Sequence, residues 1–254
     1  MRFAGSAAVI TGGGQGIGAA VARALAAEGA AVVVAARSRE RTEAVAAELR
    51  GAGRRAWAVT CDVTDPASVR ALAEDATRHV GGVVDILINN AGVAHSAPLH
   101  RITLEDWNRV LAVNATGTFL CTQAFLPRML ERKRGSVVNV ASVAGLAGAR
   151  YIAAYAAAKH AVIGFTRSVA AEIEGTGVTC NAVCPGYVDT EMTRESVARV
   201  VQKTGKSAEE ALRVMLATSS QQRLITPQEV AQAVLALCDP GGERVNGAAI
   251  TISG

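Results

Sequence analysis

The chain has 254 residues, of which 50% are hydrophobic and 19% are charged, so it can bury a large core and is not intrinsically disordered. The net charge of +4 raises the question of nucleic-acid binding, but the densest basic run, residues 128–134, contains no aromatic side chain that could stack on a base. We therefore expect a globular protein without a nucleic-acid partner.

Short β-branched runs alternate with alanine-rich segments of helical period from residue 6 onward. The predicted strands are 6–11, 31–35, 55–60, 84–89, 136–141 and 178–184, and the predicted helices are 17–28, 38–51, 66–80, 105–131 and 153–174. This alternation predicts an α/β fold: a single domain over residues 1–254 with a doubly wound parallel sheet (Rossmann fold) and helices on both faces. The longest uncharged stretch, residues 3–22, reads as a strand and a glycine turn, so we expect no membrane segment.

The alternation stops at residues 190–226, where the sequence is polar and helical without a strand. This segment predicts an insertion over the carboxyl edge of the sheet, where such folds bind ligands, and we expect it to be a mobile lid over the substrate. Thr226 and Pro227 then have the residue types of an N-cap and a first helical position. Residues 248–252 form a last short strand.

A glycine-rich turn joins the first strand to the first helix, with the sequence TGGGQGIG at residues 11–18. Bare backbone at such a turn lets a pyrophosphate approach the helix N-terminus, which is typical of dinucleotide binding. After the second strand, where NAD-binding folds often carry a carboxylate, the chain has Ala36 and then Arg37. A guanidinium there pairs with a 2′-phosphate, so Arg37 favours NADP(H), and NAD(H) is left open.

A candidate catalytic group follows the fifth strand. Ser142 lies directly after that strand, and Tyr155 and Lys159 are four residues apart, so they share one helical face. Hydride transfer to or from a carbinol carbon also requires transfer of the hydroxyl proton, and a tyrosine beside an ammonium can exchange that proton. The histidines and cysteines lack metal-ligand spacing, so the sequence predicts no metal site.

The order of these motifs resembles that of classical short-chain dehydrogenases/reductases over essentially the whole chain. The motifs are TGGGQGIG at 11–18, NNAG at 89–92, Asn114, Ser142, YAAAK at 155–159 and PG at 185–186. The resemblance implies an oxidoreductase in which Tyr155 is the acid/base and Lys159 its electrostatic partner. It also implies that Ser142 binds the substrate oxygen and that Asn114 supports a water chain to Lys159.

The resemblance further implies a set of cofactor contacts along the carboxyl edge of the sheet. These are Gly12, Gln15, Ile17 and Gly18 at the pyrophosphate, Arg37, Asp62 and Val63 at the adenosine, Asn90 and Gly92 at the ribose, Tyr155 and Lys159, and Val188 and Thr190 at the carboxamide. Many NADP-preferring members have Arg or Lys where this chain has Gln15. The expectation of NADP(H) therefore depends on Arg37.

The resemblance implies a small carbonyl or alcohol compound as substrate, and the candidate substrate contacts are His95, Ala144 and Tyr187. The sequence resembles 3-oxoacyl thioester reductases and hydroxybutyrate dehydrogenases, which favours reduction of a 3-oxoacyl thioester or a related ketone. The alternative is an NAD-dependent dehydrogenase of a hydroxy acid or a small cyclic secondary alcohol. The apolar surface of helices 105–131 and 153–174, with the resemblance, predicts a homo-oligomer, a tetramer.

Five cysteines without a C-x-x-C pair are typical of reduced thiols, so we expect a cytoplasmic protein.

Overall fold

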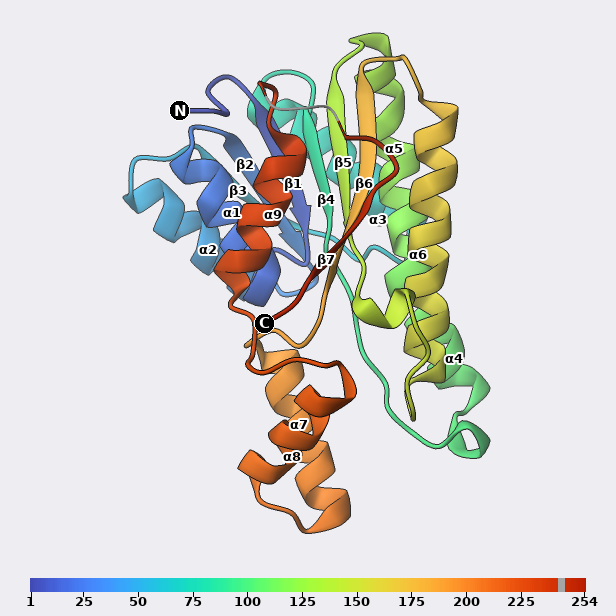
Figure 1. Ribbon diagram of the computed structural model, residues 1–254. Coiled ribbons are helices and arrows are strands. Elements are labelled where there is room, and N and C mark those ends of the chain that lie inside the picture. Colours follow the sequence, from blue (N-terminus) through green and yellow to red (C-terminus); the bar gives the residue numbers. More distant parts are fainter. Residues whose placement is uncertain (242–244) are drawn as a thin grey trace.

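The computed structural model describes residues 1–241 and 245–254. In this part of the chain, seven parallel strands form one sheet with the order β3-β2-β1-β4-β5-β6-β7 (Figure 1). The strands are β1 Ala7–Thr11, β2 Ala31–Ala36, β3 Ala56–Thr60, β4 Ile86–Asn89, β5 Gly135–Val140, β6 Val178–Pro185 and β7 Ala249–Ile252. Strands are added on one side of β1 up to β3, and then on its other side from β4 to β7. The carboxyl ends of β1 and β4 therefore border the crevice where such sheets bind ligands.

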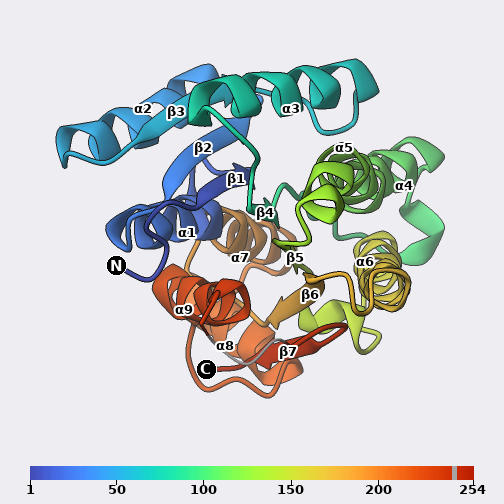
Figure 2. The same cartoon turned by 90° about the horizontal axis from the view of Figure 1, so that it is seen from above.

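Helices cover both faces of this sheet, as the view from above shows (Figure 2). The helices are α1 Gly16–Ala27, α2 Arg39–Gly51, α3 Pro66–Val80, α4 Leu104–Leu111, α5 Gly117–Glu131, α6 Ala153–Glu172, α7 Glu191–Thr204, α8 Ala208–Thr218 and α9 Pro227–Cys238. One core cluster joins the sheet to α1, α2 and α9, and a second joins it to α3, α5 and α6. This arrangement confirms the predicted doubly wound sheet.

Strand β2 reads as an unbroken apolar run because both of its faces are buried. In β2, Val32 and Val34 belong to the cluster with α1 and α9, while Val33 and Ala35 belong to the cluster with α3 and α5. All four side chains are fully buried. Alternate residues of a strand point to opposite faces, so both sets of side chains in β2 contact an apolar cluster.

The helix predicted over residues 105–131 is divided in the structure. A π-helical segment, Ala112–Thr116, separates α4 from α5. By length and composition alone, Leu104–Glu131 would pass as a membrane span, and 39% of its most apolar window is buried. In the fold, α5 packs against β4, β5 and α3, as a covering helix of the sheet does.

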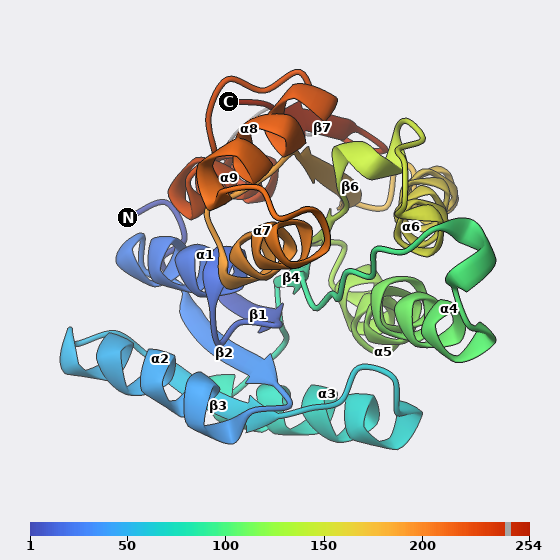
Figure 3. The same ribbon diagram turned by 90° about the horizontal axis from the view of Figure 1, so that it is seen from below.

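The region predicted as a lid consists of two helices beyond the carboxyl edge of the sheet (Figure 3). α7 ends at Gly205, whose φ of +70° is a left-handed conformation that favours glycine. Ser207 and Glu210 then form a capping box that begins α8. The two helices therefore start and stop at local signals that the sequence carries.

Candidate active site

A cleft of about 370 Å³ lies at the carboxyl ends of the central strands. Its wall is built from the glycine turn, the ends of β2 to β6, the π-helical segment, the start of α6 and the start of α7. The predicted site residues in this wall are Gly12, Gln15, Ile17, Arg37, Asp62, Val63, Asn90, Gly92, Asn114, Ser142, Tyr155, Lys159, Val188 and Thr190. The fold thus brings together predicted site residues that are spread along the chain from Gly12 to Thr190.

Hydrogen bonds between the ends of β1 and β4 hold the glycine turn. The Thr11 hydroxyl accepts from the backbone N–H groups of Asn90 at 3.0 Å and Ala91 at 3.1 Å. The Asn90 side-chain amide donates to the carbonyls of Thr11 and Gly12, both at 3.0 Å. A Cβ atom on Gly18 would lie 2.5 Å from the Gly12 carbonyl oxygen, so Gly18 packs behind the turn and outside the cleft wall. In the structure, Asn90 positions the turn through its amide.

At the end of the cleft where the adenosine is expected to bind, the positive Arg37 lies near the negative Asp62. Arg37 is exposed directly after β2, and Ala36 before it leaves space in the wall. Asp62 accepts from the backbone N–H and the hydroxyl of Thr64, and these bonds, together with the charge of Arg37, lower the pKa of its carboxyl. A bare glycine turn, a helix N-terminus and a guanidinium together fit a dinucleotide with a 2′-phosphate.

Tyr155 and Lys159 lie one turn apart on α6 and face the cleft. The Lys159 Nζ atom is 5.6 Å from the centroid of the Tyr155 ring and donates a 2.7 Å hydrogen bond to the carbonyl of Val140 at the end of β5. Ser142 accepts from the backbone N–H of Ala144 at 3.2 Å and donates to the carbonyl of Pro185 at 3.4 Å. The two polar side chains beside Tyr155 are therefore anchored on neighbouring strand ends.

Burial controls the protonation of this group. It raises the pKa of Tyr155 to about 12, and a hydrogen bond with Ser142 acts in the opposite direction. Burial lowers the pKa of Lys159 to about 8. At pH 7 the tyrosine is therefore a neutral phenol and the lysine is still an ammonium. A phenol next to an ammonium can donate a proton, because the ammonium stabilises the phenolate that remains.

Asn114 lies in the π-helical segment, and the nitrogen and the oxygen of its side-chain amide have different environments. Its amide nitrogen donates to the carbonyls of Val110 at 2.8 Å and Val93 at 2.9 Å. Its Oδ1 atom is buried and has no hydrogen-bond partner among the described residues. A Cβ on Gly92 would lie 2.8 Å from that oxygen and 3.7 Å from Lys159 Nζ. Only a glycine at position 92 leaves this space open, and the space fits the water chain that the family resemblance implies.

The three predicted substrate contacts lie outside this cleft wall. His95 faces Asp106, with 3.4 Å between Nδ1 and Oδ1. Ala144 is buried and its N–H orients the Ser142 hydroxyl, while the N–H of Tyr187 donates to Gln221 Oε1 at 2.7 Å. Their contact with substrate stays a prediction.

Gln221 is a positioning residue that sequence reasoning missed. It is buried, it binds both the N–H and the carbonyl of Tyr187, and a Cβ on Gly186 would clash with its amide at 2.2 Å. The segment that follows β6 into the cleft is thus held by a residue 34 positions away. A polar residue in a polar stretch gives no local signal of this role.

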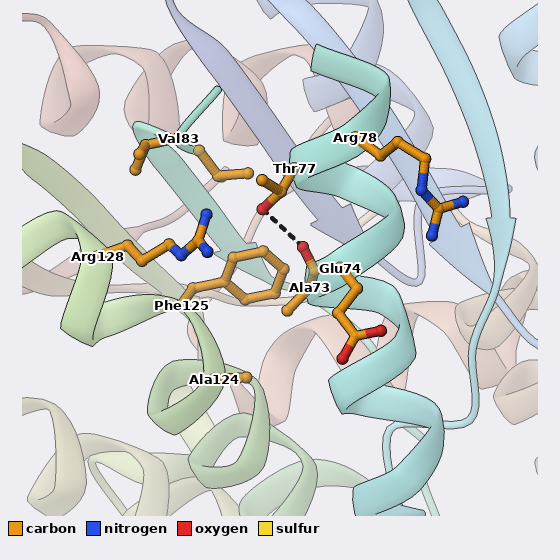
Figure 4. A pocket seen from close by; sticks show the side chains of 9 residues that line it. Ala73, Glu74, Thr77, Arg78, Val83, Ala124, Phe125 and Arg128 are labelled. Atoms are coloured by element: carbon orange, nitrogen blue, oxygen red, sulfur yellow. Dashed lines mark hydrogen bonds between the residues drawn. The ribbon is translucent and has the colours of Figure 1, made fainter. Parts of the chain in front are cut away.

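A second cavity, of about 340 Å³, lies between α3 and α5 near the amino end of β4 (Figure 4). Its wall combines Phe125 and Val83 with the charged side chains of Glu74, Arg78 and Arg128. None of the predicted catalytic or cofactor residues lines it, so the chemistry belongs to the first cleft.

Comparison with known proteins gives this site a family. Residues 6–200 match the family model described as short chain dehydrogenase. The chain belongs to the short-chain dehydrogenase family. It is therefore an oxidoreductase that interconverts ketones and alcohols, and the resemblance inferred from the motifs is confirmed.

Two curated relatives and one solved structure illustrate the family. The chain is 40% identical to 2-(S)-hydroxypropyl-CoM dehydrogenase 3 of Xanthobacter autotrophicus, over 100% of this chain and 97% of that protein. It is also 40% identical to the 3-oxoacyl-(acyl-carrier-protein) reductase of Synechocystis sp., over 97% and 95% of the two chains. An actinorhodin polyketide ketoreductase variant with NADPH has a TM-score of 0.93 and 37% identity, over 100% of this chain and 97% of its own.

The buried ammonium of Lys159 generates a prediction about stability. Lys159→Met keeps an unbranched side chain that is one atom shorter and removes the charge, so we expect a higher free energy of unfolding at pH 7. In the wild type, the pKa of Lys159 is about 8 in the folded state, and 10.5 is the ordinary value expected in the unfolded state. The free energy of unfolding of the wild type therefore rises between about pH 8 and pH 10.5, because the folded protein loses its buried charge before the unfolded chain does. The variant lacks this rise.

Urea unfolding of both proteins between pH 7 and pH 10.5 measures the effect. The stability advantage of the variant should shrink over this range by about 3 kcal/mol. A difference that is constant with pH would contradict a buried charge at Lys159.

Proposed function

We propose that the protein is an NADP(H)-dependent ketoreductase whose substrate is a 3-oxoacyl thioester or a related ketone. The observation that carries the proposal is the pairing of a neutral, half-buried Tyr155 with the ammonium of Lys159 in the wall of a cleft that also carries Arg37, at the end where the adenosine is expected to bind. A phenol that is protonated at neutral pH favours the direction in which a proton is given to a ketone. The similarity to an oxoacyl reductase and to a polyketide ketoreductase with NADPH supports the same direction.

The residues of the cleft divide the reaction between them. The nicotinamide cofactor, when bound, supplies the hydride that goes to the carbonyl carbon. Tyr155 donates its phenolic proton to the carbonyl oxygen, and Ser142 donates a hydrogen bond to the same oxygen, so that an alcohol results. Lys159 stabilises the phenolate by its charge, and the Val140 carbonyl holds the ammonium in place.

Tyr155→Phe tests the proton transfer. The variant lacks the only group assigned to protonate the ketone oxygen, so we expect turnover to fall by roughly 10³-fold or more, with NADPH affinity nearly unchanged. Tyr151→Phe, at an exposed tyrosine near the start of the same helix, is the matched control. Steady-state rates with fluorescence titration of NADPH measure both effects. Turnover of Tyr155→Phe within a few-fold of wild type would remove Tyr155 from the mechanism.

Arg37 is proposed to select NADP(H) over NAD(H). Hydrogen bonds to a charged group contribute roughly 1.5–3 kcal/mol, which is about a ten- to hundredfold change in affinity. We expect Arg37→Ala to weaken NADPH by about that factor and to leave NADH almost unchanged. Arg39→Ala is the control, because Arg39 is exposed but lies outside the cleft wall. A wild-type enzyme with higher kcat/KM for NADH would overturn the assignment.

The second candidate is an NAD-dependent dehydrogenase of a hydroxy acid or a small cyclic secondary alcohol. The similarity to 2-(S)-hydroxypropyl-CoM dehydrogenase 3, an enzyme named for an alcohol substrate, favours it. The deciding experiment compares kcat/KM for acetoacetyl-CoA with NADPH against 3-hydroxybutyrate and cyclohexanol with NAD⁺. Higher efficiency in the NAD⁺ reactions would replace the first proposal by the second.

We also propose that the chain assembles as a homotetramer in which α5 and α6 form one of the interfaces. Phe119 on α5 is 43% exposed and meets Phe165 on α6 edge to face, with 6.3 Å between ring centroids. The most apolar window of Leu104–Glu131 is only 39% buried in the single chain. A second copy with the same face would cover this surface.

Phe119→Glu should weaken this assembly, because it places a charge in an apolar interface. Sedimentation velocity at micromolar concentration should show a species of lower mass than wild type. Val214→Glu, at an exposed valine on α8, is the control and should sediment as wild type does. A wild-type protein that sediments as a 26.1 kDa monomer would overturn the proposal.

Two further assignments are part of this proposal. The α7–α8 pair brings Met192 and Thr193 to the cleft wall, which supports its role as a lid.

The five cysteines are free and buried, which supports a reducing compartment such as the cytoplasm.

A further inference from the structure

An ion pair joins the adenosine side of the cleft to the start of α7. Arg41 in the first turn of α2 meets Glu191, the first residue of α7, with 2.7 Å between Nη1 and Oε2 and 3.4 Å between Nη2 and Oε1. Both residues belong to the cleft wall. The contact joins two helices that are 150 residues apart in the chain.

The ion pair lies beside the glycine turn. A Cβ atom on Gly14 would lie 2.9 Å from the Cβ of Arg41, and one on Gly16 would lie 3.2 Å from Cγ2 of Thr190, the residue before Glu191. The turn thus touches α2 at one glycine and the N-cap of α7 at another. Arg41 and Arg37 therefore lie in the same part of the cleft wall, close to the turn that is predicted to bind the pyrophosphate.

The local electrostatics of Arg41 favour an anion. A cation in the first turn of a helix is opposed by the positive end of the helix dipole, so this position does not stabilise α2 by itself. Glu191 forms an ion pair with the Arg41 guanidinium, but both side chains are about half exposed, Arg41 at 50% and Glu191 at 46%. Exposed ion pairs of this kind contribute only about 0–1 kcal/mol, so a dianionic ligand can displace the carboxylate.

We propose that Arg41 is a second cation for the 2′-phosphate of NADP(H), and that Glu191 competes with the phosphate for it. The inference rests on the proposed use of NADP(H). It supplies the positive charge that the neutral Gln15 does not, and it makes Glu191 a residue that lowers the affinity for the phosphorylated cofactor. NADH carries no 2′-phosphate, so neither residue should affect its affinity.

Two single variants with opposite expected effects test this competition. Arg41→Gln should weaken NADPH binding about five- to tenfold, because a charge-assisted contact is lost at a half-exposed position. Glu191→Gln should strengthen NADPH binding about three- to fivefold, because Arg41 is released from its carboxylate partner. Fluorescence titration gives the Kd of NADPH and of NADH for each variant, and the NADH values should stay within twofold of wild type.

Glu195→Gln is the matched control for charge. Glu195 is also on α7, but its ion-pair partner is Arg199, so its removal changes the charge of α7 without freeing Arg41. It should leave both Kd values unchanged. If Arg41 and Glu191 only brace the glycine turn, both variants will weaken NADPH and NADH alike, and this result would overturn the inference.

Arg37→Ala separates this inference from the proposed function. If Arg37→Ala removes the preference for NADPH while Arg41→Gln and Glu191→Gln leave the NADPH Kd unchanged, only the inference about Arg41 fails. If wild type binds NADPH and NADH equally and Arg37→Ala changes neither, the proposed use of NADP(H) fails.

Discussion

The active site depends on the hydrogen bonds between the carboxyl ends of β1 and β4. These strands are neighbours in the sheet, but the chain leaves them in opposite directions, so a crevice forms between their carboxyl ends. The side chains of Thr11 and Asn90 make five hydrogen bonds across this point. The position of the glycine turn follows from these bonds, and the packing of α2 against Gly14 and of α7 against Gly16 follows from the turn.

A second constraint is the low polarity around the reacting group. Burial acts on Tyr155 and Lys159 in opposite senses, since it favours the neutral form of each. The pKa values of the two groups therefore move apart, from ordinary values of 10.0 and 10.5 to about 12 for Tyr155 and about 8 for Lys159. Both groups still hold their protons at pH 7. The same burial that destabilises the lysine charge keeps the tyrosine a phenol, which can donate its proton beside the ammonium.

Much of this arrangement could be predicted from local patterns. Apolar runs predicted the positions of the strands. The four-residue spacing of Tyr155 and Lys159 predicted that they share one helical face, because an α-helix has about 3.6 residues per turn. The remainder depends on contacts between distant residues. Arg41 meets Glu191 across 150 positions, and Gln221 holds Tyr187 across 34, so neither contact has a signature in its own neighbourhood.

The divided helix at Asn114 also limits how this region of the protein can change. An α-helix turns by about 100° per residue, so deletion of a single residue of α5 before Cys121 would rotate everything that follows by that angle relative to Asn114. Either Asn114 would turn away from Gly92 or α5 would turn its buried face, with Cys121 and Phe125, away from the sheet. The number of residues between Asn114 and Cys121 therefore cannot change, although the types of these residues can vary. Homologous chains that keep the amide here should keep the same number of residues between it and the core face of α5.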